Sequence, residues 1–525
     1  MSAGGEVYLD GPGPGVNKWG VAVAVALGAM LEIVDTSIVN VALTPIQNSL
    51  GATLGQVSWV VSGYAAANVI VLPLTAWLGE RFGKKSYFIF SLVGFTLASM
   101  LCGLAVNLPM LVISRVIQGL AGGGLLAKAQ AILFETFPKK EQPMAQAFFG
   151  AIVIAGPAIG PTLGGWLVTQ VDWRWIFYVN LPIGIVALFM VMAFLPADPK
   201  EKNKGRVDFL AIGLLAAGLG TLQVVLEEGQ SEGWFDSGFI VFFLVVALVS
   251  LLWFVGRTLA SDVPVVDLRV LRYRSLWAGS LLSIVIGMAL YGALFAVPIF
   301  AQGILHLTAQ QTGMMLLPGA LASAFTMPIA AKLLSRFDPR ILLVGGGIIL
   351  VTAILQLAQL TPASGETDFF WPLIIRSFGT VLMFLPLSMA TLGPIPKEDV
   401  GKATGIFSLT RQLGGSVGVA LLSSLLDGRL AFHRAIISEK LVASDPAVQT
   451  RVVMYAGAFA SRGSSALDAK VQAMAALDGA VRVQASVLSF ADTFWATAAL
   501  VVCTLPLVFL LGKAKGGAKA GAGAH

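Results

Sequence analysis

The chain of 525 residues is 57% hydrophobic and only 12% charged, whereas soluble domains average about 25% charged residues, so a water-soluble fold is excluded. Its formal net charge of +6 comes without a Lys/Arg run long enough for a nucleic-acid patch, and we assign it to basic loops at a membrane surface. Two cysteines in apolar stretches and three scattered histidines exclude a disulfide framework and predict that the chain binds no metal.

Continuous apolar runs, such as Phe88–Val106 and Phe239–Val255, are long enough to cross a hydrocarbon core of ~30 Å. Their continuity excludes a transmembrane barrel, whose strands alternate apolar and polar residues. The predicted fold class is therefore an all-α polytopic membrane protein. We predict fourteen spans, near 19–43, 56–78, 86–106, 109–131, 145–169, 175–195, 208–226, 238–258, 276–300, 311–334, 341–360, 371–394, 403–426 and 487–511.

Basic residues occur in every second predicted connection, as in Lys84 and Lys85 or Lys139 and Lys140. The alternate connections are neutral or acidic, as at Glu227. Since cytoplasmic loops carry an excess of Lys and Arg, this pattern predicts cytoplasmic termini and an even number of spans. The expected location is the bacterial cytoplasmic (inner) membrane.

A weak internal repeat indicates how the spans are grouped. Leu78–Lys85 (LGERFGKK) and Leu333–Arg340 (LLSRFDPR) occupy equivalent cytoplasmic loops, as expected for parallel structural repeats in transporters. We predict an N-terminal cytoplasmic tail (1–18), an N-terminal six-helix bundle (19–200), an extra helix pair (201–262), a C-terminal six-helix bundle (263–512) and a C-terminal cytoplasmic tail (513–525).

The segment 428–486 interrupts the C-terminal bundle. The alternation of basic with neutral or acidic connections predicts that this segment lies outside the cell. Asp445 followed by Pro446 is typical of a helix start, with a capping side chain and a proline in the first turn. We interpret the segment as an external helical cap. The alternative is a solvated connector.

Two acidic residues lie within the first span. At 1.5 Å per residue from Trp19, Glu32 lies about 20 Å and Asp35 about 24 Å into the membrane. Intramembrane acids are costly and are functional by default. Low dielectric and the neighbouring like charge both disfavour ionisation, which suits side chains that bind and release a proton. The alternative is a buried carboxyl with a structural hydrogen bond or ion pair.

Other polar residues within the spans extend this prediction. Arg115 lies about 9 Å below the outer surface, at a depth similar to that of Asp35, and an intramembrane arginine needs a partner. Arg411 orients anionic groups or pairs with a carboxylate such as Asp492, with simple packing as the alternative. The residues that we predict to line a substrate cavity are Gln118, Gln302, Arg411 and Asp492.

Two further motifs carry predictions about packing and gating. Glycines recur every four residues in the fifth span and form a groove for a neighbouring helix, while two prolines permit bending. This gate motif comprises Gly156, Pro157, Gly160, Pro161, Gly164 and Gly165, with plain helix packing as the alternative. The cytoplasmic loop motif comprises Glu80, Arg81, Gly83 and Lys84. The alternative is that its charged residues only anchor the helices at the membrane surface.

No catalytic constellation is present in the sequence. The absence of GxxxxGK[ST] argues against an ATP-driven pump within this chain, and no nucleophile elbow or zinc-ligand pattern occurs. We therefore predict a protein that is not an enzyme and has no cofactor. A membrane-embedded enzyme is the less favoured alternative.

Several segments together resemble the major facilitator superfamily, specifically its fourteen-helix EmrB/QacA-type drug:proton antiporters. They are Val34–Leu43, Ser114–Gly123, Gly156–Trp166, Trp173–Gly184, Pro298–Gln302, Leu316–Leu321 and Arg411–Gly418. The resemblance implies two six-helix bundles plus two extra helices. It implies proton-driven export of amphipathic hydrophobic compounds by alternating access, with Asp35 as the proton-linked carboxylate and Arg115 as its coupling partner.

The same resemblance assigns the remaining roles and partners. Gly156–Gly165 becomes the gate between the bundles, and Glu80 and Arg81 become a cytoplasmic gate latch. The energy source is the proton gradient, and the partners are small-molecule amphipathic substrates, protons and membrane lipids. In a Gram-negative host a periplasmic adaptor and an outer-membrane channel are further partners. A dedicated metabolite or lipid exporter of the same family is the alternative function, and the span-5 motif opposes a proton-coupled importer.

Overall fold

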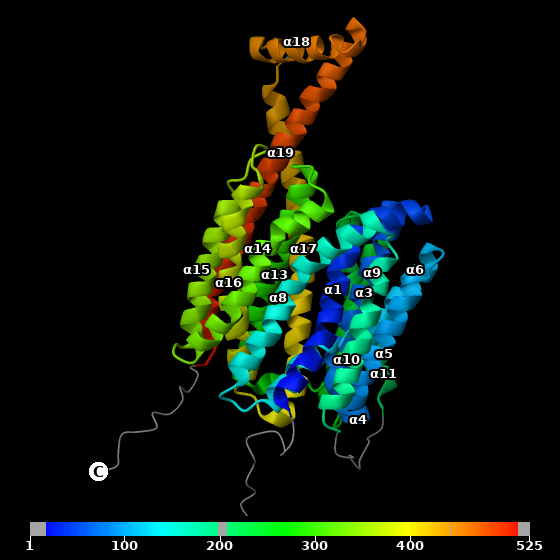
Figure 1. Cartoon of the computed structure of the whole chain (residues 1–525), viewed down its shortest axis with the longest axis vertical. Coiled ribbons are helices and arrows are strands. Elements are labelled where there is room, and N and C mark those ends of the chain that lie inside the picture. Colours follow the sequence, from blue (N-terminus) through cyan, green and yellow to red (C-terminus); the bar gives the residue numbers. More distant parts are fainter. Residues whose placement is uncertain (1–16, 198–206, 443, 513–525) are drawn as a thin grey trace, which may run out of the picture.

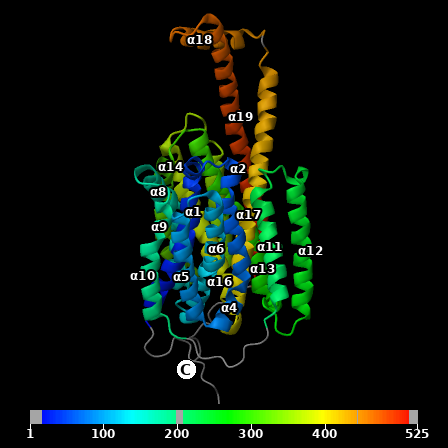
Figure 2. The same cartoon turned by 90° about the vertical axis from the view of Figure 1, so that its right-hand side faces the viewer.

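The computed structural model describes residues 17–197, 207–442 and 444–512, and every regular element in this part of the chain is a helix (Figure 1). The predicted tails therefore lie almost entirely outside the described residues. The helices form an elongated bundle, and a helical extension projects from one end of it (Figure 2). We call that end the extension side, and the opposite end, where the described chain begins and finishes, the terminal side.

The N-terminal half contains one bundle of spans. Its helices are α1 (Lys18–Leu50), α2 (Leu54–Val57), α3 (Trp59–Val71), η1 (Leu72–Leu74), α4 (Thr75–Phe82), α5 (Lys84–Gly103), α6 (Leu108–Gly122), α7 (Leu125–Thr136), α8 (Gln142–Gln170), α9 (Trp175–Tyr178) and α10 (Asn180–Phe194). Two buried apolar clusters hold this bundle together, one around Phe88 and Phe95 and the other around Trp173 and Phe177.

The second half begins with an additional pair of helices and continues into the second bundle. Its helices are α11 (Phe209–Glu228), η2 (Trp234–Asp236), α12 (Gly238–Ala260), η3 (Leu268–Arg272), α13 (Arg274–Gly303), α14 (Ala309–Leu334), α15 (Pro339–Leu357), α16 (Glu366–Leu392), α17 (Lys397–Lys440), α18 (Pro446–Ala460), α19 (Ala466–Thr504) and η4 (Leu505–Leu510). One large cluster around Phe300, Phe369 and Phe494 forms the core of the second bundle.

The structure confirms the all-α fold. Within the described residues, twelve helical stretches are long and apolar enough to cross a membrane, and each coincides with a predicted span. The other two predicted spans coincide with α8 and α13, which are 29 and 30 residues long and include side chains outside the description. A helix therefore stands at every predicted span.

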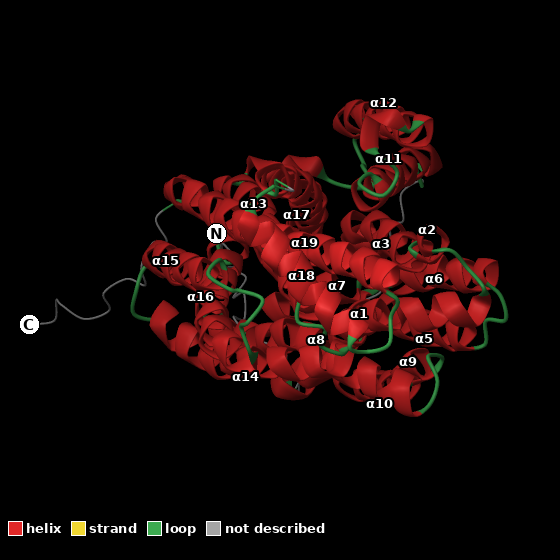
Figure 3. Ribbon diagram, turned by 90° about the horizontal axis from the view of Figure 1, so that it is seen from above, coloured by secondary structure: helices red, strands yellow, loops and turns green. Residues whose placement is uncertain are grey.

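The extra pair packs at the periphery, as the figure from above shows (Figure 3). The exposed residues of α12 are large and apolar, such as Phe242, Leu248 and Leu252, which is the composition expected of a lipid-facing helix. At the terminal side, Arg257 Nε lies 2.8 Å from Asp208 Oδ2 and joins the two helices. This guanidinium holds the pKa of the Asp208 carboxyl below its ordinary value.

The segment 428–486 is helical, as predicted. Helix α17 runs for 44 residues and α19 for 39, so both continue beyond the bundle, and α18 lies across their ends (Figure 1). Helix α18 begins where the sequence predicts, because the Asp445 side chain accepts a hydrogen bond from the backbone of Ala447 and Pro446 occupies the first turn. The predicted spans 403–426 and 487–511 give only the apolar parts of these two helices.

Candidate functional site

Asp35 lies at the centre of a buried polar cluster within the first bundle. Its side chain has no solvent exposure, and Arg115 Nη1 lies 2.5 Å from its Oδ2. Two neutral amides donate to Oδ1, Gln118 Nε2 at 3.0 Å and Asn180 Nδ2 at 2.9 Å. Donors from α6 and α10 thus converge on one carboxylate of α1. Asp35 and Arg115, which the sequence places at a similar membrane depth, are in contact.

The Arg115 side chain is itself held from several sides. Its Nε donates to the Val60 carbonyl at 3.0 Å, and Nη1 donates to Gln118 Oε1 at 2.8 Å. The guanidinium carbon lies 4.1 Å from the centre of the Tyr64 ring. A planar guanidinium can make these directed contacts together, whereas a lysine ammonium lacks the fork geometry. The arrangement therefore depends on arginine at this position.

Glu32 forms a second buried site one turn earlier in α1. Its carboxylate accepts from Asn68 Nδ2 of α3 at 2.7 Å and from the backbone N–H of Leu126, at the start of α7, at 2.8 Å. Arg411 of α17 also interacts with Glu32 electrostatically. The hydrogen-bonded partners of Glu32 and of Asp35 thus all belong to the first bundle, and the charge of Arg411 in the second bundle acts on Glu32.

The glycine stripe of the fifth span packs against α1. A Cβ atom at Gly156 would lie 2.3 Å from Ile33 Cγ2, and one at Gly164 would lie 2.6 Å from Ile38 Cγ1. At Gly160 a Cβ atom would meet Ser37 Oγ at 1.9 Å. The stripe thus joins two helices of the same bundle and places α8 directly beside the helix that carries both acids.

Gly165 lies on the face of α8 that contacts the second bundle. A Cβ atom there would lie 2.9 Å from the backbone nitrogen of Gln310 in α14, and one at Gly313 of α14 would meet Thr162 at 2.6 Å. Helix α8 therefore contacts α1 with one face and the second bundle with another. The side chain of Pro157 lies outside the described residues, and Pro161 is half-buried within α8.

Most contacts of the loop motif stay within the first bundle. Lys84 Nζ lies 2.6 Å from Glu135 Oε2 of α7, and Arg81 lies 5.8 Å from the Trp77 ring. Gly83 ends α4 at a φ of +90°, a conformation that favours glycine.

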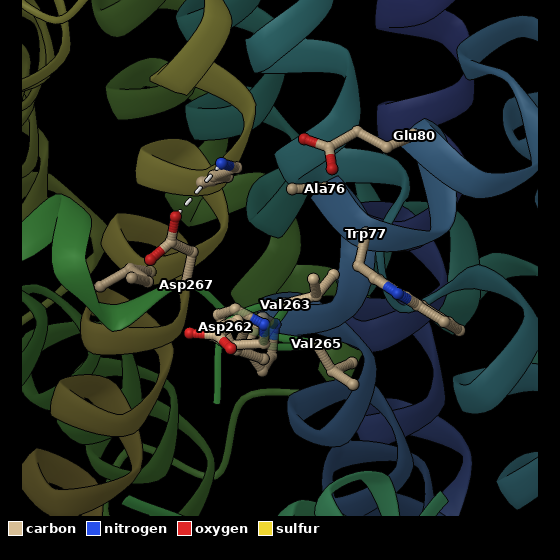
Figure 4. A pocket seen from close by; sticks show the side chains of 12 residues that line it. Ala76, Trp77, Glu80, Asp262, Val263, Val265 and Asp267 are labelled. Atoms are coloured by element: carbon tan, nitrogen blue, oxygen red, sulfur yellow. Dashed lines mark hydrogen bonds and ion pairs between the residues drawn. The ribbon is translucent and has the colours of Figure 1, made fainter. Parts of the chain in front are cut away.

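Glu80 is the member of the loop motif that faces the second bundle. It lines a cavity of about 180 Å³ between α4, α17 and the segment 262–267, together with Lys402 of α17 (Figure 4). The dashed line in that figure joins Lys402 Nζ to Asp267 Oδ2 at 3.2 Å. The cavity therefore places charges from both bundles and from the extra pair's connection beside one another on the terminal side.

The structure separates the residues predicted to line a cavity. Gln118 belongs to the Asp35 cluster, and Gln302 is exposed near the end of α13. Arg411 is buried, with its guanidinium 5.2 Å from the Phe384 ring. The suggested pairing of Arg411 with Asp492 is wrong, because Asp492 lies at the base of the extension and bonds Arg429 Nε at 2.5 Å and His433 Nε2 at 2.7 Å.

Sequence reasoning missed several partners of the acids. Asn180 donates to Asp35 and also to Ser99 at 3.0 Å, and Asn68 donates to Glu32. Each is an amide within an apolar span, which was a usable signal because buried polar groups need partners. Within the described chain no group of three His, Cys, Asp or Glu side chains could hold a metal ion.

Comparison with known proteins gives a consistent picture. A family profile described as the Major Facilitator Superfamily matches residues 25–419. The multidrug export protein EmrB of Escherichia coli is 29% identical over 506 residues, which cover 96% of this chain and 97% of that protein. The protein of the same name from Haemophilus influenzae is 31% identical over 82% of this chain and 84% of its own length. The fatty acid resistance protein FarB of Neisseria gonorrhoeae is 28% identical over 505 residues, which cover 96% of this chain and 97% of that protein.

Solved structures share the fold at low sequence identity. The human organic anion transporter MFSD10 superposes with a TM-score of 0.58 at 14% identity and covers 92% of this chain and 99% of its own. The proton:xylose symporter XylE superposes with a TM-score of 0.57 at 12% identity, with coverage of 93% and 96%. These similarities concern the arrangement of the helices.

Proposed function

The chain belongs to the Major Facilitator Superfamily, and we propose on that premise that it is a proton-driven exporter of amphipathic hydrophobic compounds. The observation that carries the proposal is the buried cluster in which Asp35 contacts Arg115, Gln118 and Asn180. An intramembrane carboxylate of this kind marks a proton pathway in transporters. The extensive similarity to the EmrB export proteins supports export as the direction of transport.

In this proposal Asp35 exchanges a proton as its surroundings change. Burial disfavours the charged carboxylate, whereas the guanidinium and the two amide donors favour it. A rearrangement of α1 against α6 and α10 that removes even one donor alters that balance. Protonation from one side of the membrane and release to the other would then be coupled to alternating access, without any cofactor.

We assign the terminal side to the cytoplasm of a bacterial cell. The basic residues Lys84, Lys332, Arg336 and Lys397 lie in helix ends and connections on that side, in agreement with the positive-inside rule. The extension then projects into the periplasm in a Gram-negative host. A periplasmic adaptor, joined to an outer-membrane channel, is the partner that we assign to it.

A second candidate is a dedicated exporter of one lipid or metabolite. Arg411 is a buried cation beside the rings of Phe384 and Phe407, and this combination suits an amphipathic anion such as a fatty acid. The relative named for fatty acid resistance supports the same class. A comparison of a fatty acid with a lipophilic cation, each as the substrate that drives proton flux, separates the two candidates.

The proposal is tested in proteoliposomes with an imposed pH gradient. Vesicles with an acidic lumen, containing protein oriented with its terminal side outward, should accumulate a fluorescent lipophilic cation and lose their gradient in proportion. Equilibration of the dye without proton flux would contradict proton coupling. Accumulation only when the gradient is reversed would contradict export.

A further inference from the structure

A second pair of acids lies at the extension-side end of α11, away from the Asp35 cluster. Glu228 is only 4% exposed. Its carboxylate accepts hydrogen bonds from Ser62 Oγ at 2.5 Å and Ser58 Oγ at 3.1 Å, both at the start of α3 in the first bundle. Ser231 donates to the same carboxylate at 3.1 Å. One acid therefore joins α11 to the first bundle.

The adjacent residue joins α11 to the second bundle. Glu227 Oε1 accepts from Ser416 Oγ of α17 at 3.2 Å and from Gln223 Nε2 at 2.8 Å. The following residues reinforce this contact, because Gln230 Nε2 donates to Asp427 Oδ2 and Trp234 Nε1 to Ser424 Oγ, each at 2.9 Å. The view from above shows α11 beside both α3 and α17 (Figure 3). Consecutive carboxyl groups thus attach one helix to both bundles.

Neutral groups surround both carboxylates. In the described part of the chain, no Lys, Arg or His nitrogen forms an ion pair with Glu227 or Glu228, and their side-chain donors are hydroxyl and amide groups. Beside them, the fully buried Gln223 Oε1 has no hydrogen-bond donor. Glu228 is buried and Glu227 is half-buried, and an ionised carboxylate in such surroundings without a cation is costly. A protonated Glu227 could instead donate to Gln223 Oε1 after rotation of that amide.

Other titratable groups near the pair do not supply the missing charge. Within its described residues, α3 carries no charged side chain, and its Tyr64 is engaged with Arg115. Helix α12 has Arg257 at its terminal-side end only. On α17, Asp427 is a further acid, Arg429 and His433 bond Asp492, and Arg411 lies more than one turn from Ser416, beside the Phe384 ring. The connection after α11 adds two further acids, Glu232 and Asp236.

We propose that Glu227 and Glu228 form a second proton-binding site, and that its protonation holds the two bundles together on the extension side. When both acids are ionised, their mutual repulsion and their need for water favour separation of α11 from α3 or α17. When they are protonated, Glu228 retains its serine hydroxyl partners, Glu227 retains Ser416 and Gln223, and the contacts close. The inference rests on the proposed proton-coupled function, to which it adds a step.

That step fits an exporter whose extension side faces the more acidic compartment. The open extension side would release substrate and expose both carboxyls to protons. Protonation would then permit closure and return of the binding site to the terminal side. The extra helix pair would thus act on the transport cycle, although α12 itself lies at the lipid-facing edge of the molecule.

The experiment measures the separation of the bundles as a function of pH. Spin labels are placed at Ser49→Cys, at the exposed end of α1, and at Ala431→Cys on α17, in a Cys102→Ser/Cys503→Ser background. Double electron–electron resonance is recorded on the full-length protein in nanodiscs at a series of pH values from about pH 5 to pH 8.5, because low dielectric disfavours the charged form of a carboxyl group. We expect the short-distance population to increase several-fold as the pH falls.

The variants assign that titration to the acidic pair. Glu227→Gln/Glu228→Gln preserves the hydrogen-bonding partners without the charge, so the short distance should dominate at every pH. Glu232→Gln, which removes an exposed acid from the connection after α11, is the matched control. Its distance distribution should change with pH as in the parent protein. A double variant that titrates like the parent, or that stays open at every pH, would overturn the proposal.

A further variant separates this inference from the proposed function. In Asp35→Asn the distance change should persist, because the acidic pair is intact, although proton-driven transport is lost. Disappearance of the pH response in Asp35→Asn would overturn the second site and leave the role of Asp35 standing. A persistent pH response in a parent protein that shows no proton-coupled transport would instead refute the proposed function alone.

Discussion

At the scale of single residues, the carboxylate of Asp35 is defined by the donors that reach it. Arg115 supplies a charged donor, and Gln118 and Asn180 supply neutral ones from two helices. Hydrogen bonds and an adjacent cation stabilise an ionised carboxylate in a buried site, and without them the neutral form is favoured. Relative movements of the three helices therefore alter the set of donors around this carboxylate.

Replacement of Asp35 by asparagine should abolish proton-driven transport. The amide has nearly the same volume but cannot titrate, so substrate accumulation should fall to the level of vesicles without a pH gradient, while substrate binding persists. Proton release on substrate addition, measured in detergent, should disappear in parallel. Asp172→Asn, which removes a carboxylate from the part-exposed pair with Arg174, is the control and should transport normally.

Replacement of Arg115 by lysine should also impair coupling. The ammonium cannot reproduce together the contacts with Asp35, Gln118 and the Val60 carbonyl, and loss of a hydrogen bond to a charged group costs about 1.5–3 kcal/mol. We expect a lower thermal unfolding midpoint and transport reduced about tenfold or more, by the conversion of 1.4 kcal/mol to a factor of ten. A lysine variant with parental transport and stability would show that only the positive charge matters.

At the scale of helices, the position of α8 depends on its glycines, which have no side chain. The glycines at 156, 160 and 164 allow the backbone of α8 to approach α1 closely, and Gly165 allows the same approach to α14. One continuous helix therefore contacts both α1 of the first bundle and α14 of the second bundle. The alternating-access role of this helix follows from these two contacts and remains a prediction.

Addition of a single methyl group at Gly160 tests the close packing. The new Cβ atom would overlap Ser37 Oγ at 1.9 Å and approach the Ile38 backbone nitrogen at 2.9 Å. Overpacking of this kind costs about 1–3 kcal/mol, so Gly160→Ala should lower thermal stability and transport. Gly213→Ala on α11, where a Cβ atom meets nothing within 4 Å, is the matched control. Equal behaviour of the two variants would contradict the packing role.

The start of α18 depends on a side-chain cap. Asp445→Ala removes the acceptor for the Ala447 backbone N–H and should destabilise the helix by about 1 kcal/mol. Hydrogen exchange of the first turn of α18 should accelerate several-fold, while exchange in the bundle is unchanged. Arg451→Ala, at an exposed position within α18, should leave these rates unaltered. Unchanged exchange in Asp445→Ala would show that contacts other than the cap fix the start of the helix.

At the scale of the whole molecule, both ends of the described chain lie on one side and the α18 extension lies on the other, as the predicted even number of spans requires (Figure 1). Charge asymmetry between the two sides determines orientation in the membrane. The extension carries both acidic and basic residues, and long loops respond weakly to this rule. We therefore propose that the shorter basic connections on the terminal side face the cytoplasm.

Cysteine labelling in intact cells tests this topology. In a Cys503→Ser background, Ser461→Cys at the exposed end of α18 should react fully with a membrane-impermeant maleimide. Ser335→Cys, at the exposed terminal-side end of α14, should react only after permeabilisation. The opposite pattern would invert the proposed orientation, and labelling of both positions from one side would exclude the predicted number of spans.

The sequence by itself determined the membrane-spanning helices and the presence of costly acids at Glu32 and Asp35. Both depend on local properties, because a continuous apolar run must form a helix in lipid and a carboxylate within it needs a partner. The start of α18 was equally local, since Asp445 caps the helix that it precedes.

Only the tertiary structure decided which partners meet. Asn180 lies 145 positions from Asp35 in the chain, and the serine that bonds Glu227 lies 189 positions away, so no local pattern predicts either contact. The glycine stripe showed that some helix approaches closely, but the packing of the bundle selected α1 as that helix. The extra length of α17 and α19 was likewise hidden from the sequence. Hydropathy marks where a helix is in lipid, whereas contacts between helices decide how far it continues into water.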